Sequence, residues 1–201
     1  MADTALAAET IDRLFADIQQ EFQDLRTPAW SEQFQASGVA LLLGKDTCAL
    51  ANVGVDRAWL RRNGEMTQVS QDLTLQDVIG AGLPDGLADQ PGSYFGRFGG
   101  LTARWQVRCI TPHRGDVFLL ASGFRGLGIE AAVLENELTR VLSDWEQNDR
   151  QPDQQPREDR WAAMLANRLS DVVSCQHDEE ARKRARWHLH SRLALAIVKI
   201  A

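Results

Sequence analysis

The chain has 201 residues, of which 44% are hydrophobic and 25% charged, with 22 Lys and Arg against 28 Asp and Glu. This length predicts one domain with its own core, and the composition is that of an average soluble protein. The net charge of −6 argues against general nucleic-acid binding, which needs basic residues along the phosphates. No segment approaches the roughly 20 apolar residues of a membrane span, so we expect no membrane partner.

The cysteines and the first residues favour a cytoplasmic location. Cys48, Cys109 and Cys175 are few, odd in number and far apart, which suits a reducing compartment better than a disulfide framework. The first ten residues hold neither a basic region nor a long apolar stretch, so they do not resemble a secretory signal.

The amino-terminal part predicts a helix over residues 1–27 followed by strands. Pro28 ends the helix, because proline cannot continue the backbone hydrogen bonds. Residues 38–43 are apolar throughout, as in a strand buried on both faces, and residues 47–53 form the next strand. The apolar positions of the helix recur at helical spacing; they are Ile11, Leu14, Phe15, Ile18, Phe22 and Leu25.

A hairpin and a short helix follow. Asn63-Gly64 separates two strand-like segments, residues 58–62 and 65–69. This dipeptide predicts a type I′ turn, because both residues tolerate a positive φ. Residues 75–81 predict a short helix.

The next predicted elements complete a β-rich core over residues 38–121. Residues 82–100 are rich in Gly and Pro and predict an irregular loop. Residues 101–110 alternate apolar and polar side chains, which predicts a half-buried strand with Cys109 on its inner face. Residues 116–121 predict a buried strand.

The remainder predicts a helical segment over residues 128–190 and a closing strand over residues 192–200. Helices on either side of a largely antiparallel β-sandwich define an α+β fold in one domain, residues 1–201.

Five segments carry motifs in a fixed order. They are residues 51–57 (A-N-V-G-V-D-R), 62–65 (R-N-G-E), 68–72 (Q-V-S-Q-D), 115–123 (G-D-V-F-L-L-A-S-G) and 191–198 (S-R-L-A-L-A-I-V). Their order resembles the metal-dependent protein serine/threonine phosphatases of type 2C, whose motifs include A-N-V-G-D-S-R, Q-L-T-x-D-H, G-D-x-L-L-L-x-S-D-G and D-N-I-T-V-I-V-V. The resemblance implies the same α+β sandwich, but without the family's amino-terminal strands, its phosphate-binding arginine and its D-G-H-G-G metal turn.

The departures from the family fall on the metal-binding aspartates. The family holds two Mg²⁺ or Mn²⁺ ions on carboxylates, which are the ligands that hard cations require. Val55, Gly123 and Ser191 stand where the family has aspartates, although Asp56 is adjacent to Val55. We therefore expect a degenerate, non-catalytic relative without a metal or other cofactor. Its degenerate family positions are Val55, Asp56, Arg57, Asp72, Gly123 and Ser191.

The resemblance implies a pseudophosphatase of bacterial type, acting as a regulatory or scaffolding module in Ser/Thr phosphorylation or secretion-system signalling. Another protein or a second copy would cover the sheet edge or face that the absent strands expose. Two alternatives stay open: a structural subunit of a larger assembly, and a phosphatase that binds Mg²⁺ or Mn²⁺ with relocated ligands. Relocated ligands would come from Asp46, Asp56, Asp72, Asp85, Asp89 and Asp116.

Two other groups of residues have alternative interpretations. Tyr94, Phe95, Arg97 and Phe98 form either a partner-binding surface or a loop packed onto the core. Cys175, His177, His188 and His190 include zinc-binding residue types, but their spacing matches no standard site and basic residues surround them. Histidines that pack or face solvent are the better interpretation of this group.

Overall fold

The computed structural model describes residues 2–24, 35–84, 86–96, 103–122, 131–148 and 194–200. These residues belong to two compact units, one of residues 1–122 and 195–201 and the other of residues 123–194. The predicted helices beyond residue 148, the group of Cys175 and the three histidines, and the family positions Gly123 and Ser191 lie outside the described residues. So do Arg97 and Phe98.

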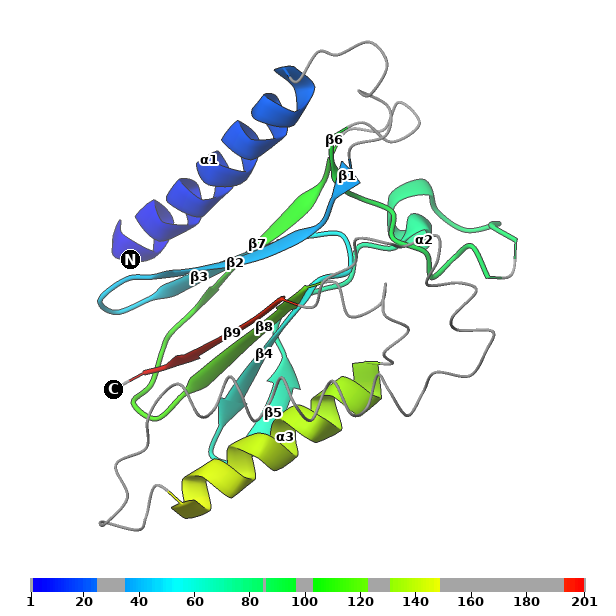
Figure 1. The fold of residues 1–201 in the computed structure, drawn as a ribbon. Coiled ribbons are helices and arrows are strands. Elements are labelled where there is room, and N and C mark those ends of the chain that lie inside the picture. Colours follow the sequence, from blue (N-terminus) through cyan, green and yellow to red (C-terminus); the bar gives the residue numbers. More distant parts are fainter. Residues whose placement is uncertain are drawn as a thin grey trace. The chain divides into compact units, whose positions relative to one another are not determined.

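The first unit contains the helices α1 and α2, two stacked sheets and a small two-stranded sheet (Figure 1). One sheet has the strand order β2-β3-β7 and the other the order β5-β4-β8-β9, and a small sheet pairs β1 with β6. The elements are α1 (Ala2–Asp24), β1 (Gln35–Ala36), β2 (Gly38–Leu43), β3 (Cys48–Val53), β4 (Arg57–Arg62), β5 (Glu65–Gln68), α2 (Leu75–Ile79), β6 (Phe95–Gly96), β7 (Trp105–Ile110), β8 (Val117–Ser122) and β9 (Ala194–Lys199).

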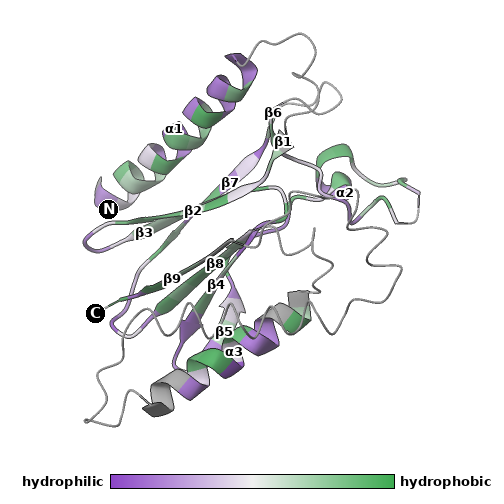
Figure 2. Ribbon diagram, in the orientation of Figure 1, coloured by the Kyte–Doolittle hydropathy of each residue, from purple (hydrophilic) through white to green (hydrophobic). Residues whose placement is uncertain are grey.

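Two apolar clusters hold these layers together. One lies between the sheets, where Leu50 of β3 and Phe118 of β8 are buried. The other lies between α1 and the three-stranded sheet, where Ile11 and Phe15 of α1 pack against the opposite face of β3. Figure 2 shows the corresponding pattern, with apolar strands and an α1 that alternates between apolar and polar residues. Because β3 contributes to both clusters, all six of its residues are buried.

The hairpin prediction is confirmed. Antiparallel pairing joins β4 to β5, with Arg62 opposite Glu65. Asn63 and Gly64 in the turn have φ values of 54° and 85°, the positive values that a type I′ turn requires. The predicted short helix is also present as α2, where Thr74 and Asp77 form a capping box.

Four expectations differ from the structure. β2 is an edge strand and half-buried, because no strand among the described residues pairs with its outer side. Leu14 of the predicted apolar stripe is 48% exposed, because it lies at the margin of the face that contacts the sheet. Cys109 is exposed rather than buried, because it lies near the end of the edge strand β7. The loop after α2 includes the short strand β6, which pairs with β1.

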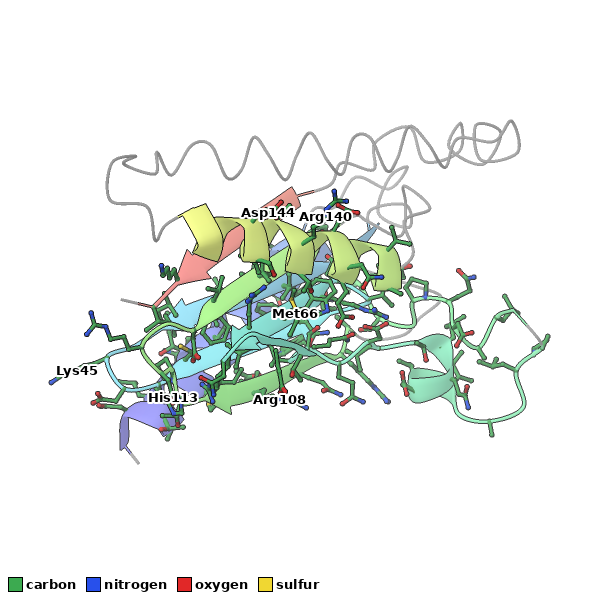
Figure 3. The ribbon with its side chains drawn as sticks, turned by 90° about the horizontal axis from the view of Figure 1, so that it is seen from below. Lys45, Met66, Arg108, His113, Arg140 and Asp144 are labelled. Carbon is green, nitrogen blue, oxygen red and sulfur yellow. The ribbon has the colours of Figure 1, made fainter. Side chains whose placement is uncertain are left out.

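The second unit is described over α3 (Ala131–Asn148). Leu138, Val141 and Leu142 of this helix are buried, at the i, i+3, i+4 spacing of one helix face. Arg140 and Asp144, labelled in Figure 3, belong to the same helix.

Candidate functional site

The connection between β3 and β4 passes from one sheet to the other, and it carries the first family motif. Gly54 begins this turn with φ +80°, and a Cβ atom there would lie 2.9 Å from the carbonyl oxygen of Ser93. Glycine is the residue that this close backbone approach allows. The backbone N–H of Leu73 donates to the Gly54 carbonyl at 2.8 Å, which ties the turn to the segment before α2.

Asp56 follows in this turn and is 3% exposed. The hydroxyl of Ser122, at the end of β8, donates to Asp56 Oδ2 at 2.8 Å. Val55 and Gly123, two of the three positions where the resemblance implies an aspartate, are the chain neighbours of this pair. Ser122 was not identified from the sequence as a partner of Asp56.

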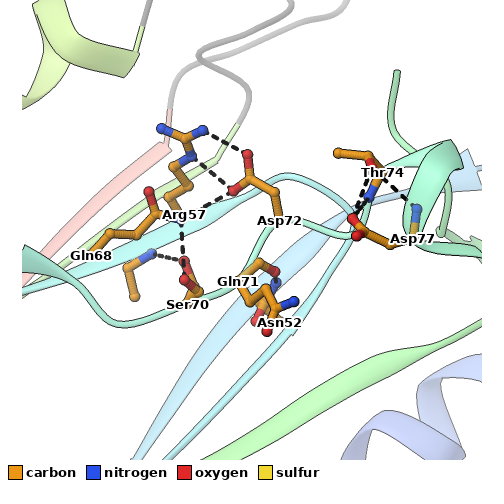
Figure 4. A network of polar contacts seen from close by, with 9 residues as sticks. Asn52, Arg57, Gln68, Ser70, Gln71, Asp72, Thr74 and Asp77 are labelled. Atoms are coloured by element: carbon orange, nitrogen blue, oxygen red, sulfur yellow. Dashed lines mark hydrogen bonds and ion pairs between the residues drawn. The ribbon is translucent and has the colours of Figure 1, made fainter. Parts of the chain in front are cut away.

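Arg57 and Asp72 form an ion pair with two hydrogen bonds beside this turn (Figure 4). Arg57 Nε donates to Asp72 Oδ1 at 2.8 Å and Nη2 donates to Oδ2 at 2.6 Å. Gln68 Nε2 also donates to Asp72 Oδ1, at 3.1 Å. Each side chain of the ion pair is 15% exposed. The Asp72 carboxylate is thus neutralised by a guanidinium that matches its geometry.

The polar contacts around this pair also fix the backbone. Ser70 Oγ accepts from the backbone N–H of Ala58 at 2.8 Å, and Asn52 Nδ2 donates to the Gln71 carbonyl at 2.7 Å. The segment from Gln68 to Asp72 is therefore bound to β3 and to β4. Its side chains serve the structure of this end of the sandwich.

A second ion pair lies at the opposite end. Arg62 donates to Asp116 through Nε at 2.9 Å and Nη2 at 2.6 Å, and the backbone N–H of His113 donates to Asp116 Oδ2 at 2.8 Å. Hydrogen bonds from Arg62 hold the pKa of Asp116 below its ordinary value and raise that of Arg62. Burial, with a smaller contribution from the Asp116 charge, raises the pKa of the Cys48 thiol.

The candidate relocated ligands are divided between these two ends. Asp46 is exposed in the turn before β3, and Asp116 lies near Cys48 at the same end. Lys45 and His113 mark this end in Figure 3. Asp56 lies beyond the other end of β3, and a six-residue strand is about 20 Å long. Asp89 is exposed in the loop after α2, and Asp85 lies outside the described residues.

The described residues do not fit a pair of divalent metal ions. In the part of the chain that the structure describes, no three His, Cys, Asp or Glu side chains come together in a way that could hold a metal ion. Mg²⁺ and Mn²⁺ need several oxygen ligands each. Here Asp72 is bound to Arg57, Asp116 to Arg62, and Asp56 to Ser122.

The loop residues proposed for partner binding are placed in part. Phe95 is 4% exposed; its ring centroid lies 5.2 Å from that of Phe15 and 6.1 Å from that of Phe22. It therefore packs onto the core, the second of the two interpretations. Tyr94 is half-buried. Gln19, not identified from the sequence, is bound through its amide to both backbone groups of Gly96.

Comparison with known proteins places the fold. No family model and no curated protein sequence matches the chain. The S. agalactiae serine/threonine phosphatase has a TM-score of 0.59 at 15% identity, over 96% of this chain and 72% of that one. The catalytic domain of the serine/threonine phosphatase PstP in complex with two manganese ions has a TM-score of 0.50 at 17% identity, over 92% of this chain and 67% of that one.

A third solved structure is PppA, a key regulatory component of the T6SS in Pseudomonas aeruginosa. It has a TM-score of 0.53 at 21% identity, over 68% of this chain and 58% of that one. The chain thus spans less than two thirds of PppA. Together the solved structures show that the chain has the fold of the type 2C serine/threonine phosphatases, as its motif order predicts. Among the described helices, none is long and apolar enough to cross a membrane.

Proposed function

We propose that this protein is a pseudophosphatase, a regulatory or scaffolding module that keeps the phosphatase fold without its metal chemistry. The observation that carries the proposal is the state of Asp56. It is the acidic residue nearest to a family metal position, and it is buried and bound to the Ser122 hydroxyl. Val55 beside it offers no ligand atom in its side chain.

The other carboxylates of the two sheets support the same conclusion. A carboxylate that is already paired with a guanidinium in two hydrogen bonds would have to give up that ion pair to bind a cation. Asp72 and Asp116 are both in this state. The family reaction needs two metal ions about 4 Å apart to activate the attacking water, and this pattern of paired acids does not supply their ligands.

The proposed cellular role is supported by the kinds of protein that share the fold. Two of the compared structures are serine/threonine phosphatases and one is a regulatory component of a secretion system. We accordingly propose that the chain acts by binding a protein of Ser/Thr phosphorylation or of secretion-system signalling.

Calorimetric titration of the full chain with Mn²⁺ tests the loss of metal chemistry. We expect no binding up to millimolar Mn²⁺, with the PstP catalytic domain, which was solved with two manganese ions, as the positive control. A variant with Val55→Asp, Gly123→Asp and Ser191→Asp restores the three family acids in this chain. Tight two-site binding by the unmodified chain would overturn the proposal.

The absence of catalysis and the binding of a partner are tested with the same protein in two experiments. The full chain is incubated with phosphoserine and phosphothreonine peptides and Mn²⁺, and released phosphate is measured. We expect no release above a buffer control. The same protein is then used to capture partners from native lysate, where recovery of a kinase, a phosphoprotein or a secretion component is expected. Phosphate release, or capture of none of these, contradicts the proposal.

A further inference from the structure

The sheets of the described residues end in edge strands of two kinds. β7 carries Gln106 and Arg108, and β5 has four residues and carries Glu65 and Gln68. β9 ends at the exposed Lys199. Charged or short edge strands resist pairing with another chain. β2 differs from all of them, since its six residues, G-V-A-L-L-L, include no polar or charged side chain.

β2 also touches the core on both of its faces. Val39 and Leu41 pack against the cluster between the two sheets. Ala40 and Leu42 pack against the cluster under α1. All four side chains remain half-buried, whereas all six residues of the adjacent β3 are buried. A further strand beside β2 would extend both apolar clusters.

The backbone of β2 indicates what kind of group would pair with its outer side. Within the described part of the chain, β2 pairs with β3 along one side. Its other side presents backbone N–H and C=O groups that require hydrogen-bond partners when buried. The group that satisfies this edge is an extended strand, uncharged and apolar on both faces. The sequence of β2 itself has these properties.

We propose that β2 is a dimerisation edge, which pairs antiparallel with β2 of a second copy of this chain about a two-fold axis. The two sheets would join in the order β7-β3-β2 and, in the second copy, β2-β3-β7. This inference does not rest on the proposed function.

The proposed register places the two-fold axis at Leu41, so that the apolar residues of the two copies lie opposite one another. A two-fold axis perpendicular to the sheet keeps each face on its own side, so opposite residues must come from the same face. Leu41 then lies opposite Leu41 of the second copy, Ala40 opposite Leu42, and Val39 opposite Leu43. Leu43, which is 45% exposed, gains an apolar neighbour. The nearest charged residues, Lys45 and Asp46, fall beyond these pairs, so no like charges oppose each other.

Light scattering after size-exclusion chromatography of the full chain, at a series of concentrations, tests the proposal. We expect a dimer whose dissociation constant rises about tenfold or more in Leu43→Lys, because two lysines enter an apolar edge. Leu14→Lys is the matched control, since Leu14 is exposed to a similar extent, 48%, on α1. It should dimerise like the unmodified chain, and circular dichroism should show that both variants are folded.

A cross-link tests the register of the pairing. Leu41→Cys is made in a background with Cys109→Ser and Cys175→Ser, and mild oxidation should give a covalent dimer. Leu14→Cys in the same background should give none. The proposal is overturned if the unmodified chain is monomeric at every concentration, if Leu43→Lys dimerises as tightly as Leu14→Lys, or if the Leu41→Cys dimer does not cross-link.

Discussion

β4 begins with Arg57 and ends with Arg62, and each arginine holds an aspartate through Nε and Nη2. The shorter donor–acceptor distance is 2.6 Å in both pairs, yet the two ends of the strand differ in burial. The side chain of Asp116 is 2% exposed, against 15% for Asp72. Asp116 also accepts from the backbone N–H of His113, whereas Asp72 accepts from the Gln68 side chain.

The comparison shows that residues of the family motifs can have a structural role. All four residues stand in the motif segments: Arg57 and Asp72 in residues 51–57 and 68–72, and Arg62 and Asp116 in residues 62–65 and 115–123. The ion pair at each end of β4 holds a connecting segment in place. Arg57 holds the segment before α2, and Arg62 holds the turn before β8. The motif residues at both ends therefore support the fold.

Breaking the pair that contains the more buried aspartate should have the largest effect, although Arg62 itself is 31% exposed. In Arg62→Met the apolar stem is kept, but Asp116 is left as a buried charge without its guanidinium. We expect the free energy of unfolding to fall by about 3 kcal/mol, measured by urea denaturation at pH 7. Arg140→Met is the control, because the Arg140–Glu137 pair is 3.9 Å apart and Arg140 is 65% exposed. The free energy of unfolding of this variant should fall by no more than about 0.5 kcal/mol.

The Arg57–Asp72 pair should contribute less. Arg57→Met leaves Asp72 with its Gln68 hydrogen bond and partial access to water, so we expect a loss of about 2 kcal/mol. A double-mutant cycle with Asp72→Asn isolates the coupling between the two side chains. A loss in Arg57→Met larger than that in Arg62→Met would show that burial does not set the order of the two ends.

The sequence predicts those parts of the fold that local patterns determine. The positive φ of Asn63 and Gly64 follows from the turn chemistry of two adjacent residues. The buried strand β8 follows from an apolar run. The order of the family motifs predicts the type of fold, because the motifs occur in the same sequence order as in the family.

The remaining features depend on contacts between residues far apart in the chain. Nothing near Arg62 indicates that Asp116, 54 residues later, is its partner. The apolar run of β2 predicts burial on both faces, but the edge position depends on which strands pair. Cys109 alternates correctly with its neighbours, and it is exposed because the strand lies at an edge. Phe95 packs on α1 through a loop whose sequence specifies no element.

The smallest expected effect is the pH dependence of the stability that the Asp116 carboxylate contributes. The hydrogen bonds from Arg62 hold the pKa of Asp116 below its ordinary value of 3.8, so the charged carboxylate stabilises the folded state. This contribution is complete above that ordinary pKa and is lost as the pH falls through the lower pKa of the folded protein. We expect Asp116→Asn to be less stable than the unmodified chain at pH 7, with a gap that narrows as the pH is lowered towards 3. Urea denaturation of both proteins at several pH values measures it. A gap that stays constant over this range would mean that Asp116 acts through the shape of its hydrogen bonds and not through its charge.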